Sequence, residues 1–501
     1  MNSINKIVKE SSINFSGSVL GNILGYVWLM FMTRYLSQED FGSFTLAQSI
    51  INVSMIFVLL GTHRSLDRFI PIFNASGEYG KVKSLLRIIF QLAFLTNIIV
   101  GLVLYLGTDF LSEKVFSNPT LSAILPVTIL TIPLLAITMI VGYAFSGYKE
   151  LRYHVYLKQI IEPGLKIIFA ITVAVFSLGV VQWTWLYLGA LLITAAVAVW
   201  LLATRIIKPL ADVVSQKNNV WEILSYSWPI SISSILIIII GQIDYLILGI
   251  YHPAANVGIY RIYIQIIVLL KLILGSMARI YKPVISELIP EGKIQEIKDT
   301  YRKISKWVLA LTTLGLVVII LYGNRLTSLL FTDAYAVYPL ALIILAIGTY
   351  LNSTFGPEGM TLEAFGNTKL VMMNSLISLS VNVGLGFLLI PVYGILGAAI
   401  ATGVTLTIGG LLGFLEIYIL YKMQPFSRNT LKFILIGTIT GVVFFYLDRW
   451  LMIENVVFLV ISILLLIGFY SLGIILSDCL DEEDKEIIQN LFKRIQNGFA
   501  K

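Results

Sequence analysis

The chain has 501 residues, of which 57% are hydrophobic and 13% are charged, and its formal net charge is +7. Soluble proteins carry roughly 25% charged residues, so this composition excludes an ordinary soluble globular protein and a disordered chain. A single cysteine, Cys479, excludes a disulfide framework, and the three histidines lack the spacing of a metal site. No GxxxxGK[ST] sequence for binding ATP phosphates occurs. The composition therefore predicts an all-α polytopic membrane protein with no bound metal and no ATP use of its own.

About fourteen segments are long and apolar enough to form membrane-spanning helices, each needing roughly 20 residues. The segments begin near Ser12, Phe41, Ser84, Leu121, His154, Trp183, Ser225, Val257, Ser305, Ala336, Leu370, Ile395, Asn429 and Val456. The first apolar stretch is long and lacks a small-residue cleavage site, so we expect no cleaved signal peptide. The loops between segments are too short to hold a separate domain.

Basic residues alternate between loops in a way that predicts the topology. With the N-terminus inside, the outer loops contain only a few basic residues, namely Arg34, Lys114, Arg325 and Arg449. Most of the 35 Lys and Arg residues then lie in inner loops and tails, as the positive-inside rule requires. The sequence predicts a multi-pass protein of the plasma membrane with both termini cytoplasmic. The net charge of +7 is thus a topology signal and does not indicate nucleic-acid binding.

Two stretches of sequence repeat along the chain. The segment 34–44 resembles the segment that ends at Tyr260, with Phe44 aligned to Tyr260, and 145–149 resembles 365–369. Extending the second alignment without a gap pairs Glu162 with Asn382. An even number of spans separates the copies, which predicts two parallel lobes related by a pseudo-two-fold axis. The predicted regions are an N-terminal lobe 1–211, a C-terminal lobe 212–424, two further spans in 425–478 and a cytoplasmic tail helix in 479–501.

Five short motifs occur in order along the chain. They are Arg34-Tyr-Leu with Phe41-Gly42, Gly61-Thr-His-Arg64-Ser-Leu-Asp-Arg68-Phe, Ile243-Asp244-Tyr-Leu-Ile-Leu-Gly249, Val257-Gly258-Ile-Tyr260 and Tyr393-Gly-Ile-Leu-Gly-Ala-Ala-Ile-Ala-Thr402. With these motifs the chain resembles the polysaccharide (O-antigen, Wzx-type) flippases of the multidrug/oligosaccharidyl-lipid/polysaccharide exporter superfamily. The resemblance implies a two-lobe transporter with the fold of multidrug exporters and a central cavity, which works by alternating access. It also implies a polyprenyl-pyrophosphate-linked oligosaccharide as cargo, moved from the inner to the outer leaflet.

Cationic residues within and beside the spans are candidates for binding the pyrophosphate. In the eighth predicted span, Arg261, Lys271 and Arg279 lie in one stripe with Lys282, because a helix advances about 100° per residue. A structural alternative is that Arg279 and Lys282 only follow the positive-inside rule and that Arg261 snorkels to the surface. Lys271 lies about 13 Å from the inner end of the span, where that explanation is weakest.

Three further arginines lie at the ends of the first two spans. Arg64 and Arg68 match the basic positions of the family motif at the inner end of span two, where they either capture the head group or anchor the helix at phospholipid. Arg34 ends span one on the outer side, against the positive-inside bias. It either contacts cargo or forms a headgroup contact or salt bridge.

Two acidic residues are candidates for coupling transport to an H⁺ or Na⁺ gradient. Glu162 lies four residues from both Lys158 and Lys166, a spacing that supports either a self-neutralised network or ion binding. Pro163-Gly164 follows at once and predicts a break in the span. Asp244 either binds a cation or makes a structural hydrogen bond.

Three aromatic residues, Trp28, Tyr260 and Tyr263, are candidates for stacking on sugar rings, the alternative being helix packing. The predicted function is that of a flippase for lipid-linked oligosaccharide in cell-surface polysaccharide biosynthesis, with no enzyme activity. Its partners would be membrane lipids and polysaccharide polymerases or assembly proteins. The alternatives are a cation-coupled multidrug exporter, a lipid II flippase and, last, a membrane glycosyltransferase or polymerase.

Overall fold

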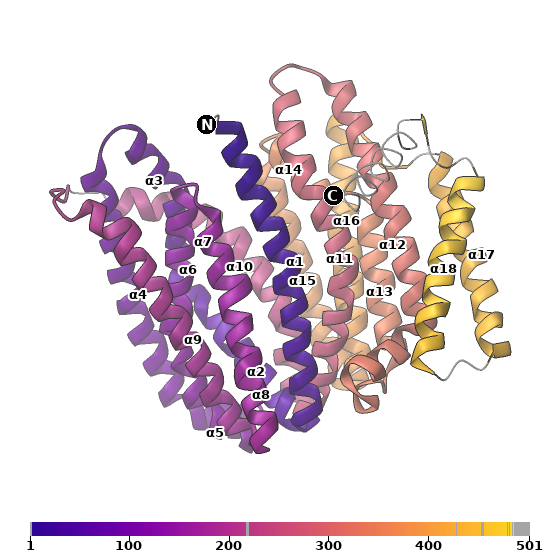
Figure 1. Cartoon of the computed structure of the whole chain (residues 1–501), viewed down its shortest axis with the longest axis horizontal. Coiled ribbons are helices and arrows are strands. Elements are labelled where there is room, and N and C mark those ends of the chain that lie inside the picture. Colours follow the sequence, from indigo (N-terminus) through magenta and orange to yellow (C-terminus); the bar gives the residue numbers. More distant parts are fainter. Residues whose placement is uncertain are drawn as a thin grey trace, which may run out of the picture. The chain divides into compact units, whose positions relative to one another are not determined.

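The structure is a computed structural model that describes residues 3–216, 220–426, 428–451, 455–477, 479, 481, 482 and 484. Every regular element in this part of the chain is a helix (Figure 1). This confirms the predicted all-α fold. Of the predicted tail helix in 479–501, residues 485–501 lie outside the described residues.

The described residues contain twelve helices long and apolar enough to cross a membrane, or thirteen if one bent pair counts as a single span. The predicted number of about fourteen is therefore not confirmed, although a helix covers each predicted span. The difference falls on α10 (Val220–Tyr251), of which only Ile235–Tyr251 qualifies, as a shorter apolar helix. Many side chains in 222–234 are not described.

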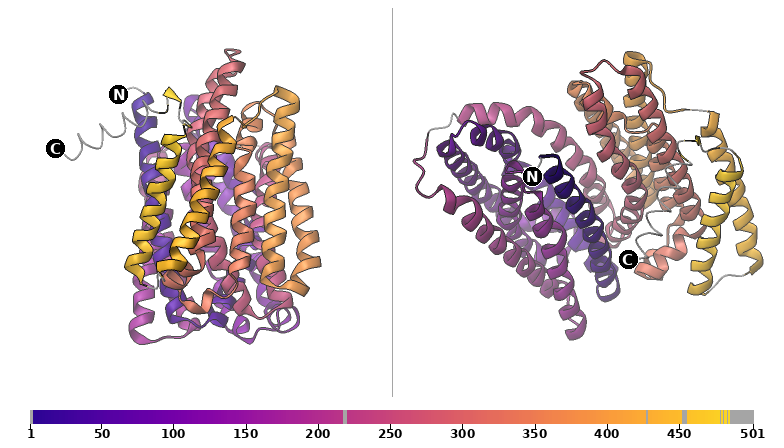
Figure 2. Two further views of the ribbon diagram at one scale, coloured as in Figure 1. Left: turned by 90° about the vertical axis from the view of Figure 1, so that its right-hand side faces the viewer. Right: turned by 45° about the horizontal axis from the view of Figure 1, so that its top comes forward.

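The chain divides into two compact units, each described here by itself. Unit 1 comprises Met1–Ile262, Leu330–Tyr335 and Asn382–Ala398, and unit 2 comprises Tyr263–Leu329, Ala336–Val381 and Ala399–Lys501. These units reflect packing density and not the sequence repeat, so the predicted lobe boundaries remain a prediction. Figure 2 shows the same helices from two further directions.

The long helices of unit 1 are α1 (Ser3–Tyr35), α2 (Gln38–Leu59), α4 (Tyr79–Leu106), α6 (Thr131–Gly147), α8 (Glu162–Phe176), α9 (Val180–Leu202) and α10. Shorter helices are α3 (Ser65–Ala75), α5 (Pro119–Ile129), α7 (Leu151–Val155), η1 (Thr62–Arg64), η2 (Phe110–Val115), η3 (Tyr156–Ile161), η4 (Ala203–Ile207) and η5 (Lys208–Leu210). Side-chain caps start some of them: Ser37 accepts from the N–H of Asp40, and Asn118 from that of Leu121.

The predicted break at Pro163-Gly164 is not a gap in the helix. The span Leu151–Phe176 runs on through α7, η3 and α8, and the turn before Glu162 is π-helical. Pro163 follows this π-helical turn directly, and the altered hydrogen-bond pattern of such a turn accommodates a residue that has no N–H to donate. The proline therefore widens the helix locally instead of dividing it.

The repeated glycines have a packing role in unit 1. A Cβ atom on Gly42 would lie 1.7 Å from the carbonyl oxygen of Ala254, and one on Gly258 would lie 3.0 Å from Phe41. Glu39 accepts hydrogen bonds from the N–H groups of Ala254 and Ala255 at 3.3 and 3.1 Å. Helix α2 and the first turns of α11 (Ala254–Leu288) thus approach closely only because both repeats carry glycine at this position.

Unit 2 contains most of α11 and of α12 (Ile294–Phe331), together with α13 (Pro339–Thr354), α14 (Glu358–Ala364), α17 (Arg428–Leu451) and α18 (Val456–Leu476). The helices α15 (Thr368–Tyr393) and α16 (Ile395–Tyr421) contribute to both units, and η6 (Asp333–Tyr335) belongs to unit 1.

The two last helices pack on α12 within unit 2. Tyr470 donates to the carbonyl of Ala310 at 2.9 Å, and Tyr322 hydrogen-bonds Ser462 at 2.7 Å. Beyond α18, the buried Lys306 forms ion pairs with Asp481, at 2.6 Å, and with Asp484. Helix α18 and the acidic residues that follow it are therefore anchored to α12 by polar contacts.

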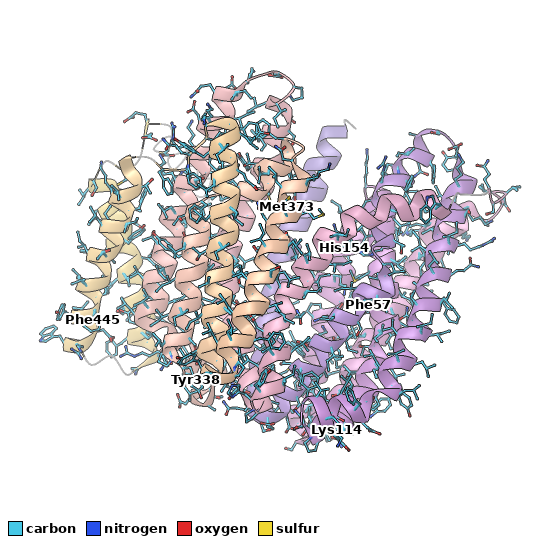
Figure 3. The ribbon with its side chains drawn as sticks, turned by 180° about the vertical axis from the view of Figure 1, so that it is seen from behind. Phe57, Lys114, His154, Tyr338, Met373 and Phe445 are labelled. Atoms are coloured by element: carbon cyan, nitrogen blue, oxygen red, sulfur yellow. The ribbon has the colours of Figure 1, made fainter. Side chains whose placement is uncertain are left out.

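Within unit 1 the two ends of the spans can be compared with the predicted topology. Helix α1 begins at the top of Figure 1, whereas Lys114 lies at the bottom of unit 1 in Figure 3, which keeps the same vertical axis. A residue of a predicted outer loop thus lies at the end of the unit opposite to the start of α1.

Candidate functional site

A cavity of about 400 Å³ lies within unit 1 where α2 ends. Its polar lining comes from five elements: α2, η1, α6, η3 and α10. These residues are Asn52, His63, Arg64, Tyr143, Lys158 and Gln242. The remaining wall is apolar and includes Met55, Leu59, Leu135 and Met139. Two cationic side chains in a small cavity with apolar walls are suited to an anion.

The turn after α2 places Arg64 at this cavity. Leu60 ends α2 with a positive φ of 46°, and Gly61 follows with a φ of 68°. Two residues in the left-handed region reverse the chain into η1, and glycine adopts this conformation without strain. The motif glycine thus turns Arg64 toward the cavity, and Arg68 lies one helical turn further on, exposed, 5.7 Å from the ring of Phe69.

His63 is a site residue that the sequence reasoning missed, because histidines were weighed only as metal ligands. Its side chain is 8% exposed, and Nδ1 has no hydrogen-bond partner among the described residues. Burial, and then the charge of Arg64, lower the pKa of His63 to about 4. The imidazole is therefore neutral near pH 7 and can donate or accept a hydrogen bond in the cavity.

Tyr143 is the second missed residue. Its ring stands edge-on to His63 with the centroids 4.7 Å apart, and edge-on to His154 at 6.4 Å. His154, labelled in Figure 3, lies against Gly142 so closely that a Cβ on this glycine would be 2.3 Å from Nδ1. Nothing in the local sequence marks Tyr143, because its position depends on the packing of α6 against α3 and α7.

Glu162 binds both lysines of its helix, as the spacing indicated. Lys158 Nζ lies 3.1 Å from one carboxylate oxygen and Lys166 Nζ 2.7 Å from the other. Glu162 is only 6% exposed, so the network lies inside unit 1. Lys158 also lines the cavity, so Glu162 fixes a cavity cation in place.

Lys166 connects this network to two aromatic side chains. Its Nζ lies 5.4 Å from the ring centroid of Trp28 and 4.9 Å from that of Tyr187. The two rings stack on each other with centroids 6.4 Å apart, and both are buried. In this structure Trp28 stacks on protein groups, and its role with sugar stays a prediction.

Asp244 lies in a second buried polar cluster of unit 1. Tyr260 donates to one carboxylate oxygen at 3.0 Å and Asn382 to the other at 3.3 Å. Asp244 is 5% exposed and Asn382 1%, and Oδ1 of Asn382 has no hydrogen-bond partner within the described part of the chain. The carbonyl oxygen of Ala398 lies 3.5 Å from the Tyr260 hydroxyl. The Asp244 carboxylate, the Tyr260 hydroxyl and the Ala398 carbonyl oxygen therefore lie together in a buried place, and oxygen is the donor type that small hard cations prefer.

The two clusters occupy equivalent positions of the sequence repeat. The alignment of the first repeated stretch relates Trp28 to Asp244 and Phe44 to Tyr260, and that of the second relates Glu162 to Asn382. Trp28 contacts Phe44 edge-on at 6.2 Å, as Asp244 contacts Tyr260. The equivalent positions are thus in contact in both copies, through two aromatic rings in the first and through a hydrogen bond in the second. The charged residues of the first copy are Glu162 and its two lysines, whereas the charged residue of the second copy is Asp244.

Arg261 lies between these clusters. Its guanidinium carbon is 6.0 Å from the ring of Tyr245, and it interacts electrostatically with Lys166 and Tyr187. The side chain is half-buried. The structure thus brings Arg261, one of the predicted cations of span eight, next to the Glu162 network.

The other predicted cations are found in different surroundings. Lys271 is exposed in the part of α11 that belongs to unit 2, and the side chain of Arg279 lies outside the described residues. Lys282 forms an ion pair of 2.6 Å with Glu363, so its charge is compensated. Arg34 is exposed in the last turn of α1, where a cation interacts favourably with the helix dipole.

The third predicted aromatic residue, Tyr263, is 1% exposed, and its hydroxyl accepts a hydrogen bond from the N–H of Tyr338 at 2.8 Å. Tyr260 is likewise 1% exposed. In this structure both tyrosines therefore hold helices together, and any contact with sugar stays a prediction.

The chain is similar to several curated proteins over most of its length. A "Probable low-salt glycan biosynthesis flippase" of Haloferax volcanii is 23% identical, over 83% of this chain and 85% of the relative. The capsular polysaccharide biosynthesis protein CapF of Staphylococcus aureus is 24% identical, over 83% of this chain and 99% of the relative.

The fold is similar to that of the lipid II flippase MurJ in an inward closed conformation. The TM-score is 0.73 at 16% sequence identity, and the similarity covers 93% of this chain and 98% of MurJ. At this identity the likeness establishes the fold, which is that of a multi-pass membrane protein.

Family comparison gives two overlapping matches. Residues 229–388 match the MatE family, and residues 7–289, more than half of the chain, match the family described as "Polysaccharide biosynthesis protein". The predicted relationship is confirmed: the chain belongs to the polysaccharide biosynthesis protein family.

Proposed function

We propose that this protein is a flippase for lipid-linked oligosaccharides in cell-surface polysaccharide biosynthesis. It moves a polyprenyl-pyrophosphate-linked oligosaccharide from the inner to the outer leaflet of the plasma membrane by alternating access. The observation that carries the proposal is the cavity of unit 1, where Arg64 and Lys158 supply positive charge and His63 and Tyr143 supply neutral polar groups. The names of the relatives from Haloferax and Staphylococcus support this substrate class.

The cavity matches the two polar parts of such cargo. A pyrophosphate inside the membrane needs cationic partners, because burying an unpaired charge is costly. Sugars need hydrogen-bond donors and acceptors beside an aromatic surface, which His63 and Tyr143 offer at the same wall. The protein performs no bond chemistry in this proposal, so it is a transporter and not an enzyme, with both termini cytoplasmic and polymerases or assembly proteins as partners.

We further propose that an H⁺ or Na⁺ gradient drives transport through Asp244 and not through Glu162. The carboxylate of Glu162 already binds two ammonium groups, which favours its permanently charged form. Asp244 accepts a hydrogen bond from the amide nitrogen of Asn382, and the amide oxygen Oδ1 of Asn382 is buried without a hydrogen-bond partner among the described residues. A cation bound by the oxygens of Asp244 and Asn382 would satisfy Oδ1 of Asn382. Release of the cation would leave this buried oxygen without a partner, and the resulting rise in free energy would favour another conformation.

Flipping in reconstituted proteoliposomes tests the function. A labelled polyprenyl-pyrophosphate oligosaccharide is placed in one leaflet, and its exposure to an external glycosidase is followed with time. We expect exposure that depends on the protein and is lost in Arg64→Ala but kept in Arg302→Ala, since Arg302 is an exposed surface arginine. If no glycolipid is flipped but cationic dyes are expelled against an ion gradient, the multidrug exporter replaces this proposal.

A further inference from the structure

One face of α4 carries a continuous stripe of residues that line hollows at the surface of unit 1. The stripe runs from Arg87 through Phe94, Asn97 and Gly101 to Tyr105. Arg87 and Tyr105 are about five helical turns apart, so both lie on the same face. The stripe is open to the surroundings of unit 1, since Phe94 is 69% exposed and Tyr105 is 60% exposed.

Two hollows adjoin along this stripe and form one groove. The first, of about 610 Å³, runs between α4 and α6 and includes Arg87 and Ile140. The second, of about 580 Å³, continues between α4, the junction of α5 and α6, and Trp185 of α9. Phe94, Asn97 and Pro133 line both hollows, so the groove is continuous.

The bend between α5 and α6 opens this groove. The two helices meet at an angle of 44° near Leu130, and Pro126 and Pro133 flank the junction. Proline removes a helical hydrogen bond and bends the helix axis, which accounts for the angle between the two helices. Opposite the bend, α4 carries Gly101, where an added Cβ would be 3.9 Å from its nearest neighbour, Ile129. The groove thus has room that a larger residue would fill.

The two ends of the groove differ in chemistry. Arg87 is exposed at one end, and within the described part of the chain no ion pair joins it to an acidic side chain. At the other end lie Tyr105 and Trp185, both exposed, residue types that favour the membrane interface. The groove between them is almost wholly apolar, apart from the amides of Gln91 and Asn97.

The length of the groove selects its occupant. Five turns of helix cover about 27 Å, close to the roughly 30 Å of the hydrocarbon core. A phospholipid acyl chain belongs to one leaflet and would cover about half of this distance. A long polyprenyl chain is an apolar ligand that can continue through both leaflets while its phosphate stays at one interface.

We propose that this groove holds the polyprenyl tail of the carrier lipid, with the carrier's phosphate on Arg87. The inference rests on the proposed function, which supplies a polyprenyl-linked cargo. Arg87 lies near the start of α4, and Arg64 lies in the turn after α2, joined to α4 by the short α3. The groove is therefore a holding site from which the head group reaches the cavity while the tail remains bound.

Photolabelling of the full-length protein in nanodiscs tests this site. The probe is a long-chain polyprenyl phosphate with a diazirine on its terminal isoprene, and adducts are mapped by mass spectrometry. We expect adducts concentrated on α4, α5 and the first half of α9, competed by unlabelled polyprenyl phosphate and far less by phosphatidylglycerol or farnesyl phosphate. In Arg87→Gln, half-maximal labelling should need about tenfold more probe, the loss expected for one charge-assisted contact.

A matched pair of variants separates filling of the groove from a general effect of added bulk. Gly101→Leu fills the groove and should abolish labelling there, whereas Gly468→Leu should label as the wild type. Gly468 is an exposed glycine of α18, and no described atom outside its own stretch of helix lies within 4 Å of an added Cβ. Thermal unfolding of both variants shows whether either of them is misfolded. If one is misfolded, the distribution of adducts on the wild-type protein alone tests the holding site.

Labelling spread evenly over all lipid-facing helices, or competed equally by phosphatidylglycerol, would overturn the holding site. The flipping assay separates this failure from that of the proposed function. Protein-dependent flipping without labelling of the groove would refute the holding site and leave the flippase proposal intact. Labelling of the groove without flipping of any glycolipid would refute the flippase proposal, while the groove would still be a binding site for a prenyl lipid.

Discussion

The ammonium group of Lys166 lies 2.7 Å from a carboxylate oxygen of Glu162, deep inside unit 1. Lys158 binds the other oxygen, so one acidic side chain holds two cations. Such a network costs desolvation energy when it is buried, so its presence is by itself weak evidence of added stability. In the proposed mechanism Glu162 fixes Lys158 at the cavity and Lys166 against the aromatic pair, Trp28 and Tyr187.

The network makes Glu162→Gln strongly destabilising. Without the carboxylate, two poorly solvated ammonium groups lose their partner, and breaking a buried pair costs about 3–5 kcal/mol. Thermal unfolding in detergent should show a clearly lower midpoint than for the wild type. The control is Glu363→Gln, which breaks the exposed pair with Lys282 and should change stability by under about 1 kcal/mol. Equal effects of the two variants would contradict the buried network.

Asp244→Asn should uncouple transport from the ion gradient. The amide cannot supply the negative charge that a cation needs, while the hydrogen bond from Tyr260 can be kept. Flipping under an imposed H⁺ or Na⁺ gradient should fall to the rate seen without a gradient. Asp299→Asn, at an exposed position of α12, should respond as the wild type. A variant of Asp244 that still accelerates with the gradient would exclude this coupling site.

Lys271→Ala should abolish flipping while the protein still inserts in the membrane. The reason is electrostatic. Lys271 lies within a predicted span, and its replacement removes a positive charge that would bind the pyrophosphate during its passage. Membrane fractionation and size-exclusion chromatography establish insertion and folding. Lys293→Ala, at an exposed residue outside this span, is the matched control. Wild-type flipping by Lys271→Ala would end the proposal for this residue.

His63 should make stability depend on pH. Its pKa is about 4 in the folded protein and 6.5 in an unperturbed histidine, so the unfolded chain binds the proton more tightly. Stability is therefore full above about pH 6.5 and falls as the pH drops from there to about 4, by roughly 3 kcal/mol in the limit of a single group. In His63→Gln the unfolding midpoint should vary less across this window. An unchanged pH dependence would show that other groups dominate it.

Side-chain contacts could be predicted from the sequence where they are local, whereas the roles of the site residues stay predictions. Lys158, Glu162 and Lys166 meet because residues four apart share a helix face, and this needs no knowledge of other helices. His63 and Tyr143 could not be found in this way, since they come from different elements and meet only through the packing of α3 and α6. Neither residue has a local pattern that separates it from ordinary helix-packing residues.

The burial of Tyr260 and Tyr263 shows a second limit. An aromatic residue in an apolar span has the same sequence pattern whether it faces cargo, lipid or another helix. Only the tertiary structure shows that Tyr260 donates to Asp244 and that Tyr263 accepts from the backbone of Tyr338. The repeat alignment of Glu162 with Asn382 was visible in the sequence, but the contact of Asn382 with Asp244 was not.

The sequence by itself determined that the protein is an all-α, multi-pass membrane protein of the polysaccharide biosynthesis family, because hydrophobic length, loop charge and glycine motifs are local properties of the chain. The tertiary structure decided which polar groups share a cavity, that α7 and α8 continue through a π-helical turn, and that a groove follows α4. These features depend on helix rotation, bending and contact between distant segments. One-dimensional periodicity constrains the buried face of a helix, but it does not specify the neighbour that this face meets.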